Sequence, residues 1–223
     1  NGHLDILEYL REKGCPWDQG AIHAAATNGR FECLKYLHEE GCEVHGCGLV
    51  LCEDIIASGH LECIKYCVKN GIIQLTLKER VEDFCYIVAE KGNLECLKYL
   101  HESGVAWDEQ TCSVTALKGH LECLKYAHEN ECPWNTLTVK YAVEKGNLEC
   151  LRYALENGCA WDDRTCRWAE ERHREDKNYE ACMKYVNDLI GDISCITNRG
   201  LQKYWIYKDF HQSVEQKDSC IQG

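Results

Sequence analysis

The sequence has very little proline and methionine, with two and one among 223 residues, and it has no long apolar run. No stretch approaches 18 consecutive apolar residues, and the chain does not open with a charged, apolar and small-residue signal segment. We therefore expect no membrane-spanning segment and no secretory leader. The chain begins at Asn1 and Gly2 inside a repeat described below, so we expect a fragment of a longer polypeptide.

Positive charge is also scarce. Lysine and arginine total 25 against 37 aspartate and glutamate residues, a formal net charge of −12. Nucleic acids and anionic membranes require a basic face that displaces counterions, so neither is expected as the main partner. The surface of a protein, neutral or basic, suits this chain better.

Signatures of catalysis are missing as well. The sequence holds no GxSxG, no GxxxxGK followed by serine or threonine, and no GxGxxG. His38, His101 and His128 each precede a glutamate, but none belongs to an HExxH pair. Because they recur at one repeat position, we expect them to pack and form hydrogen bonds between repeats. We predict neither an enzyme nor a bound cofactor.

What the chain does have is a tyrosine in a nearly constant setting, clearest in GNLECLKY (92–99) and GHLECLKY (119–126). Its successive separations are 27, 30, 33, 27, 27 and 32 residues. Self-similarity at such a period is typical of a stacked repeat protein, in which each unit packs on its neighbours. The recurring residues are Tyr9, Tyr36, Tyr66, Tyr99, Tyr126, Tyr153 and Tyr185.

Each unit is expected to form two helices. In 92–104 the apolar side chains spread over more than half of the helix circumference, while Glu95, Lys98 and Glu102 share one narrow sector. The sequence thus predicts an all-α array over 1–190 and an extension over 191–223 with one helix and a mobile tail. The expected units are a half repeat at 1–14 and units at about 15–41, 42–71, 72–104, 105–131, 132–158 and 159–190, the last with capping character.

Helix ends are marked by glycines. Glycine recurs after the first and second helix of most units, where a left-handed residue is expected, but Glu131 stands at one such position. That junction should be strained or differently turned. Asn93 or Asn147 is expected to cap a second helix, and Asp18, Asp108, Asn135 and Asp162 suit the caps of first helices.

The eighteen cysteines recur with the repeat, and isoleucine or valine takes the place of cysteine at the same positions in other units. Small buried hydrophobes behave in this way, which predicts reduced packing residues in an intracellular protein. The alternative is a metal-binding or redox-sensing array. Its strongest zinc candidate is the group Cys42, His45, Cys47 and Cys52, whose spacing does not match a paired CxxC site.

A tryptophan precedes the cap in the connectors CPWD (15–18), VAWD (105–108), CPWN (132–135) and CAWD (159–162). The structural interpretation is a hydrophobic staple, in which the ring packs on the residue four positions into the next helix. The functional interpretation is a row of tryptophans that binds a ligand, because aromatic residues are enriched in interface cores.

The segment AIHAAATNGRFECLKYLHEEGCEV (21–44) resembles the ankyrin repeat, and the resemblance spans about residues 1–190. From Gly14 to Gly29 the count is 15, against 21 in the family's 33-residue unit. The six absent residues belong to the connector that forms the family's β-hairpin finger. Such 27-residue units with CPWD connectors are similar to the shortened ankyrin-type arrays of large DNA viruses, algae and other protists. Only the link 72–91 is long enough for a retained projection or a lengthened helix.

The resemblance implies an ankyrin-like helix-turn-helix solenoid with mostly truncated fingers, and a non-catalytic scaffold that binds a protein of unknown identity on its concave face. It also implies a monomeric array in the cytoplasm, or in a host cytoplasm or nucleus if the source is viral. With fingers missing, binding should pass to connectors and first helices. The candidate contact residues are Trp17, Gln19, Trp107, Glu109, Gln110, Trp134, Thr136, Trp161, Asp163 and Arg164.

Overall fold

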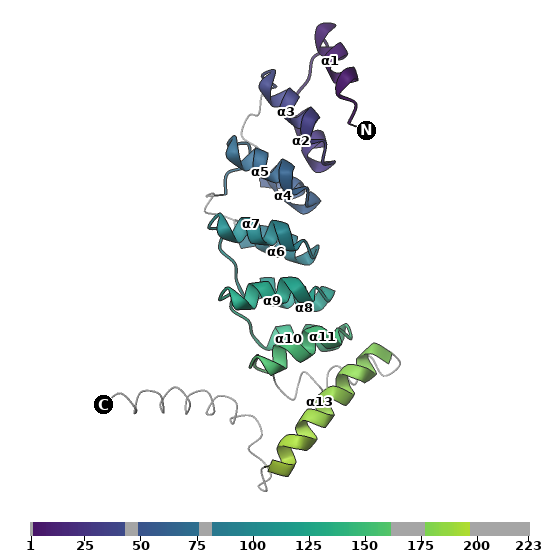
Figure 1. Cartoon of the computed structure of the whole chain (residues 1–223), viewed down its shortest axis with the longest axis vertical. Coiled ribbons are helices and arrows are strands. Elements are labelled where there is room, and N and C mark those ends of the chain that lie inside the picture. The colour runs from purple at the N-terminus through teal and green to yellow at the C-terminus, as the bar shows by residue number, and fades with distance from the viewer. Residues whose placement is uncertain (1, 43–48, 76–81, 162–176, 197–223) are drawn as a thin grey trace, which may run out of the picture. The chain divides into compact units, whose positions relative to one another are not determined.

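The structure is a computed structural model of the chain, and it describes residues 2–42, 49–75, 82–161 and 177–196. Within these residues the regular elements are twelve helices, with no strand (Figure 1). No helix in this part of the chain has both the length and the apolar character needed to cross a membrane. The helices are α1 (Leu4–Glu12), α2 (Gln19–Thr27), α3 (Phe31–Glu39), α4 (Leu49–Ser58), α5 (Leu61–Lys69), α6 (Glu82–Glu90), α7 (Leu94–Glu102), α8 (Glu109–Lys118), α9 (Leu121–Glu129), α10 (Thr136–Glu144), α11 (Leu148–Glu156) and α13 (Lys177–Ile196).

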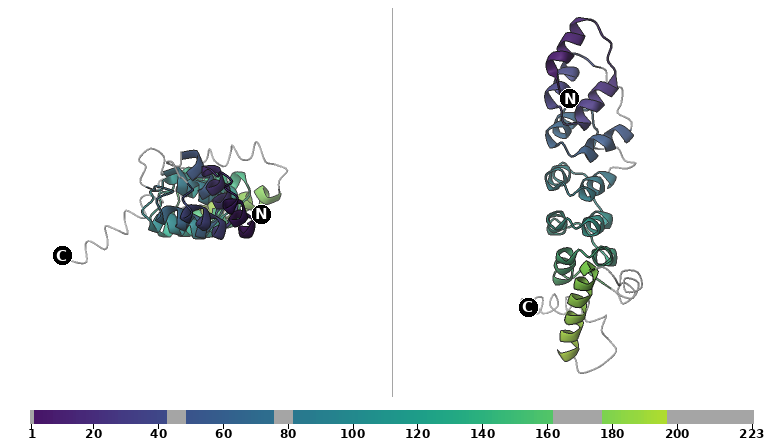
Figure 2. Two further views of the ribbon diagram at one scale, coloured as in Figure 1. Left: turned by 90° about the horizontal axis from the view of Figure 1, so that it is seen from above. Right: turned by 90° about the vertical axis from the view of Figure 1, so that its right-hand side faces the viewer.

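The chain divides into two compact units, residues 1–111 and 112–223, and each is described by itself. In the first unit α2 pairs with α3, α4 with α5, and α6 with α7 (Figures 1 and 2). The first helices pack in succession, α2 on α4 and α4 on α6, while α5 packs on α3. In the second unit α10 pairs with α11, α11 packs on α9, and α13 packs on both α10 and α11. The predicted all-α solenoid of helix pairs is confirmed.

The interior is built from apolar side chains of both helices of each pair, and one position of the second helices illustrates it. Leu34, Ile64 and Leu97 occupy the same repeat position and are 0% exposed. A fully buried side chain of this size contributes about 1.5–3 kcal/mol relative to leaving it in water. The cysteines one residue earlier are buried beside them, with Cys63 and Cys96 at 1% and 0%. Cysteine therefore does serve as a small core residue.

Turn geometry explains the recurring glycines. Gly29 has φ of 67°, and a Cβ built on it would lie 2.6 Å from the His60 ring of the next repeat. Both the backbone angle and the close approach disfavour other residues there. Glu131 adopts φ of 66°, the sole described non-glycine residue with positive φ. The predicted strain at this junction is thus present, because the glutamate takes the same left-handed turn as its glycine counterparts.

The two expected asparagine caps differ. Asn93 Oδ1 accepts a hydrogen bond of 3.1 Å from Cys96 N and caps α7 as predicted. Asn147 precedes α11 but makes no side-chain cap. Its amide Nδ2 instead donates to Ala116 O at 2.7 Å and to Leu117 O at 3.0 Å. The cap prediction for Asn147 is wrong because the side chain satisfies carbonyls at the end of the preceding repeat's first helix.

Two irregular regions fall partly outside the described residues. In the link 72–91, residues 72–75 hold no strand and the described part of α6 has nine residues, like α7, while 76–81 lie outside. Helix α13 runs without a break through residue 190, where we expected the array to end. Its exposed Glu180 and Lys184 give this last helix a polar side, and residues 197–223 lie outside the description.

Candidate functional site

The N-terminal caps of the first helices position the candidate contact residues of the connectors. Asp18 accepts from Gly20 N, Asp108 from Gln110 N and Asn135 from Leu137 N, each at 2.9 Å. These caps satisfy backbone donors that would otherwise be orphaned and hold the connector against the helix. Gln19 and Glu109 follow directly and are exposed. The caps predicted at these three positions are confirmed, and Asp162 lies outside the described residues.

The candidate residues occupy equivalent starts of different helices. In the first unit Gln19 opens α2 and Glu109 opens α8, and α4 and α6 lie between them in the chain. Gln110 turns its amide back to Asp108 Oδ2 at 3.1 Å. In the second unit Thr136 is half-buried at the start of α10, beside an exposed Leu137. Asp163 and Arg164 lie outside the described residues.

The tryptophans are half-buried against the preceding repeat helix rather than standing free. Trp107 stacks on His101 with ring centroids 3.8 Å apart, and Trp134 stacks on His128 at 3.7 Å. Trp17 lies edge-on to Tyr36, and the Arg11 guanidinium sits 4.4 Å from its ring centroid. Trp161 is half-buried too. One face of each stacked indole is therefore occupied, which favours a structural role over a ligand-binding row.

The histidines link consecutive repeats to the recurring tyrosine. His38 Nδ1 and Tyr66 OH share a hydrogen bond of 3.0 Å, and His128 Nδ1 and Tyr153 OH share one of 2.9 Å. Burial lowers the pKa of His128 from its usual 6.5, against an opposing effect of Glu129. Burial likewise raises the pKa of Tyr153 above 10.0. The His128 ring and the Tyr153 hydroxyl are thus both neutral near pH 7, and the predicted hydrogen bonding between repeats is confirmed for His38 and His128.

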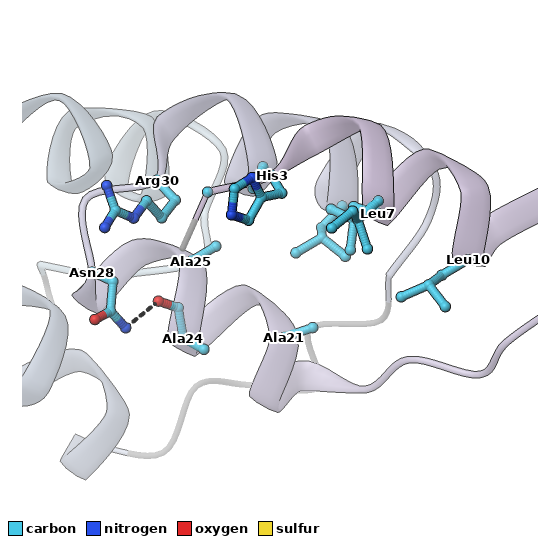
Figure 3. Close-up of a pocket in the computed structure, with 12 residues that line it drawn as sticks. His3, Leu7, Leu10, Ala21, Ala24, Ala25, Asn28 and Arg30 are labelled. Atoms are coloured by element: carbon cyan, nitrogen blue, oxygen red, sulfur yellow. Dashed lines mark hydrogen bonds between the residues drawn. The ribbon is translucent and has the colours of Figure 1, made fainter.

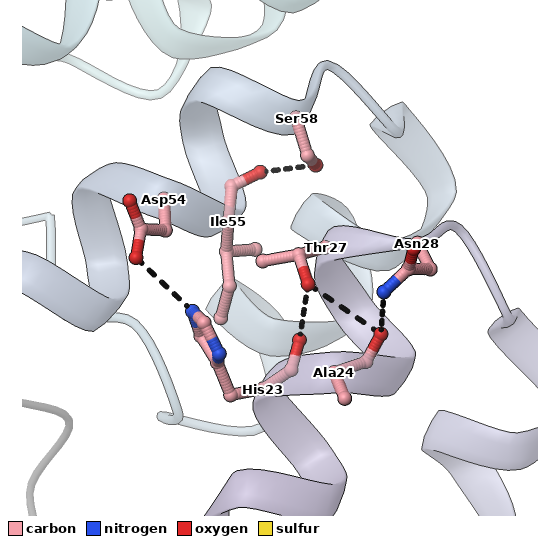
Figure 4. Close-up of polar contacts among 7 residues, drawn as sticks. All are labelled: His23, Ala24, Thr27, Asn28, Asp54, Ile55 and Ser58. Atoms are coloured by element: carbon pink, nitrogen blue, oxygen red, sulfur yellow. Dashed lines mark hydrogen bonds and ion pairs between the residues drawn. The ribbon is translucent and has the colours of Figure 1, made fainter.

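A polar pair that sequence reasoning missed joins two first helices. His23 Nε2 on α2 lies 3.3 Å from Asp54 Oδ2 on α4 (Figure 4). Around it Thr27 Oγ1 donates to His23 O at 2.8 Å, and Asn28 Nδ2 donates to Ala24 O at 2.8 Å. The Asp54 side chain is 55% exposed, so the pair lies on the surface and stabilises little. Glu53 and Asp54 stand out in the otherwise apolar run LVLCEDIIAS, but nothing in that run identifies His23 as a partner.

Charge is distributed differently over the two kinds of helix. Second helices pair their acids internally, as in Glu62 with Lys65 at 3.1 Å and Glu122 with Lys125 at 2.9 Å. Among the first helices, α4 and α6 carry carboxylates but no lysine or arginine, α2 carries neither, and α8 and α10 each carry a lysine. The carboxylates of α4 and α6 therefore have no lysine or arginine on the same helix.

The thiols are placed for packing rather than reactivity. Thirteen of the fourteen cysteines whose side chains the structure describes are buried, and Cys15 is half-buried. Burial raises the pKa of Cys96 and Cys150 to about 11 and that of Cys159 to about 12. A thiol with such a pKa is almost wholly protonated at pH 7, whereas nucleophiles and metal ligands are thiolates.

The proposed zinc group is only partly visible. Cys42 and Cys52 are 3% and 1% exposed, and Cys42 Sγ donates to Asp18 O at 3.2 Å. His45 and Cys47 lie outside the described residues. Among the residues that are described, no three of the histidine, cysteine and acidic side chains come together in a way that could hold a metal ion.

Comparison with known proteins supports the fold. Residues 1–38 match the family described as ankyrin repeats (many copies). The chain is similar to the ankyrin repeat domain of human ASB11, with 22% sequence identity, a TM-score of 0.52, and coverage of 62% of this chain and 69% of that one. A comparison with curated proteins finds no match. The helical array therefore has the ankyrin-repeat fold.

Proposed function

We propose that the chain is a non-catalytic scaffold that binds a partner protein through the first helices and their connectors, the concave face in ankyrin-type arrays. Ankyrin repeats generally mediate protein–protein interactions. The observation that carries the proposal is the contrast between a constant interior and variable starts of the first helices. Gln19, Glu109 and Thr136 follow equivalent caps, yet they differ in charge and size. Variation at exposed positions of a constant frame supports recognition.

The charge of these helices supports a basic partner surface. The Asp54 side chain is 55% exposed, and its helix α4 carries no lysine or arginine. An exposed carboxylate of this kind attracts a lysine- or arginine-rich protein segment and speeds its association at low salt. In the second unit, Leu137 is apolar and exposed, and it offers a contact of the kind found at interface centres.

Three finer features belong to the same proposal. The array is monomeric, it works inside the cell, and its units are the shortened 27-residue variety. Buried thiols that stay protonated support a reducing compartment. They give the metal-binding or redox-sensing alternative less support, since both activities need accessible thiolates.

The test is affinity capture with charge-reversed variants. Asp54→Lys changes a first helix, and Glu95→Lys is the matched control because it makes the same charge change on a second helix at similar exposure, 55% against 67%. Gln19→Lys and Gln110→Lys extend the comparison to the connectors. Captured proteins are identified by mass spectrometry and their binding is then measured with purified components at two salt concentrations.

A partner retained by wild type and by Glu95→Lys but lost by Asp54→Lys would support the first helices as the binding surface. Equal retention by both variants would move the site elsewhere. Equal loss from both variants would show that binding depends on net charge alone, because screening by salt acts on any exposed charge.

A further inference from the structure

Asparagine followed by glycine recurs at helix ends of this chain. The pair stands at 28–29, 70–71 and 157–158 within the described residues, and a further pair opens the sequence at 1–2. A glycine has no side chain to shield its backbone nitrogen, so this nitrogen readily reaches the side-chain carbonyl carbon of a preceding asparagine. In a flexible chain, asparagine therefore loses its side-chain amide most readily where glycine follows it.

The three described pairs each close a helix in the same way. Asparagine is the C-cap, and glycine is the left-handed residue after it, with φ of 67°, 72° and 81° along the chain. At the end of α5 the Gly71 N–H donates to Val68 O at 3.2 Å, and the Ile72 N–H donates to Cys67 O at 2.8 Å. These two hydrogen bonds form the Schellman motif, which satisfies carbonyls that the helix leaves open.

This turn keeps the asparagine away from reaction. The ψ angles of Asn28, Asn70 and Asn157 are 8°, 11° and 19°. Attack on the side chain requires the glycine nitrogen to eclipse the asparagine Cβ, at a strongly negative ψ outside the populated regions. The side chains are also held, because Asn28 Nδ2 donates to Ala24 O (Figure 3) and Asn70 Nδ2 donates to Tyr66 O, both at 2.8 Å. The closed turn therefore blocks the reaction, and an open turn permits it.

Two of the pairs differ in what holds the turn closed. A Cβ built on Gly29 would lie 2.6 Å from the His60 ring of the next repeat, so packing between repeats covers this glycine. A Cβ built on Gly71 would meet nothing within 4 Å, and both Asn70 and Gly71 are exposed. The turn at 70–71 thus opens without disturbing a neighbouring side chain, whereas opening at 28–29 disturbs the packing on His60. Local openings of a fold differ in free energy for such reasons.

We propose that Asn70 is a site of spontaneous deamidation, which the turn at the end of α5 closes and which becomes reactive whenever that turn opens. The Gly71 nitrogen attacks Asn70 Cγ, the bond from Cγ to Nδ2 breaks, and Nδ2 leaves as ammonia with the proton of the Gly71 N–H. A five-membered succinimide remains. Water then adds to one of its two carbonyl carbons, and the bond from that carbon to the glycine nitrogen breaks. The nitrogen regains a proton, and the product is aspartate or isoaspartate.

Both products weaken the turn that protects Asn70. Neither carboxylate donates a hydrogen bond to Tyr66 O as the amide does, and a negative charge at a helix C-terminus opposes the helix dipole. Isoaspartate also routes the backbone through its Cβ, which the turn at Gly71 does not accommodate. The modification therefore turns a transient opening of this helix end into a lasting one. It is independent of the partner protein proposed above.

The chain carries its own control at 130–131. Asn130 makes the same C-cap, with Nδ2 donating to Tyr126 O at 2.8 Å, and the next residue has the same left-handed backbone, with φ of 66°. That residue is Glu131, whose side chain shields its backbone nitrogen. Asn130 should therefore stay intact under conditions in which Asn70 reacts, and Glu131→Gly should make Asn130 reactive.

The test incubates the whole chain at mildly alkaline pH, with and without guanidinium chloride, and follows the deamidated fraction at each asparagine by peptide mapping with mass spectrometry. In denaturant we expect similar rates at Asn28 and Asn70 and no comparable reaction at Asn130. Without denaturant the rate at Asn70 should fall by roughly tenfold to a hundredfold, and the rate at Asn28 by at least about ten times more.

A variant of the turn tests whether its opening controls the reaction. Ile72 is 5% exposed and follows the turn directly, so Ile72→Ala removes a buried anchor of the turn. Without denaturant this variant should react at Asn70 at least about tenfold faster than wild type, because a buried isoleucine contributes that much to closure. In denaturant the two rates should be equal. Asn28 in the same molecules should keep its wild-type rate, and circular dichroism shows whether the variant is folded.

Several outcomes would overturn the proposal. An Asn70 that stays intact in denaturant would rule out the site, and equal rates with and without denaturant would rule out protection by the turn. A folded Ile72→Ala variant that reacts at the native rate of wild type would contradict control by the turn. Native reaction at Asn28 as fast as at Asn70 would contradict the role assigned to packing on His60. An unreactive Asn130 in denatured Glu131→Gly would contradict the requirement for glycine.

Discussion

Glu131→Gly should stabilise the protein, although it removes a whole side chain. Glu131 adopts φ of 66°, and its counterparts at the end of other second helices are glycines such as Gly104 with φ of 84°. A left-handed conformation costs an L residue about 1–2 kcal/mol. Glycine removes that cost but adds about 0.5–1 kcal/mol of backbone entropy to the unfolded chain. The difference predicts a net gain of about 0.5–1 kcal/mol.

Nothing else in the described structure opposes this gain. Glu131 is exposed, and its carboxylate makes no hydrogen bond or ion pair with a described residue. The backbone N–H of residue 131 donates to His128 O at 3.1 Å, and glycine keeps that bond. Gly104→Ala is the reverse experiment, because a Cβ at Gly104 meets nothing within 4 Å and only the backbone conformation is penalised.

Urea unfolding followed by circular dichroism and by tryptophan fluorescence measures both variants. The midpoint should rise by roughly 0.2–0.5 M for Glu131→Gly and fall by a similar amount for Gly104→Ala, at an unchanged slope. Two probes are needed because cooperativity can break down in repeat arrays. A neutral or destabilising Glu131→Gly beside a destabilising Gly104→Ala would refute the reasoning, since it would mean that the glutamate side chain compensates for the turn.

Three further predictions concern the links between repeats and the thiols. Tyr153→Phe should lower the free energy of unfolding by about 0.5–1.5 kcal/mol, because it removes the hydrogen bond to His128. Tyr99→Phe should be nearly neutral, because Val68 stands at the repeat position of that histidine. Equal urea midpoints for the two variants would contradict this. Folding lowers the pKa of His128, so the unfolded chain binds more protons than the folded chain as the pH falls below 6.5. Wild type should therefore lose more stability on acidification than His128→Phe. Urea midpoints measured above and below pH 6.5 test this. Among the described cysteines, Cys15 should react first with iodoacetamide and Cys159 among the last, and mass spectrometry that found Cys96 or Cys150 labelled as fast as Cys15 would count against packed, protonated thiols.

Much of the fold could be predicted because the same sequence pattern recurs in successive units of the chain. The spacing of Tyr36, Tyr66 and Tyr99 marked the helix pairs, and the substitution of cysteine by isoleucine identified a buried position without any contact being known. Caps at Asp18 and Asn135 were predictable because they depend on two or three neighbouring residues. The same local reasoning failed at Asn147, whose amide serves a carbonyl about thirty residues away.

The candidate site was less accessible to sequence reasoning. Trp107 and Trp134 were expected either as staples or as a ligand-binding row, and the structure places their rings on His101 and His128 of the preceding helix. The choice between such roles depends on which faces neighbouring elements cover. His23 and Asp54, on different helices and 31 positions apart, gave no sequence sign that they would meet.

The sequence by itself determined the helical array, its register and its buried thiols, because periodicity, glycine turns and caps act over distances of one repeat or less. Only the tertiary structure decided which surfaces those helices leave open. Thr111 and Thr138 are polar residues on first helices, yet both are 0% exposed. Exposure depends on whether a neighbouring helix covers the residue, and that is a property of the packed chain rather than of the local pattern.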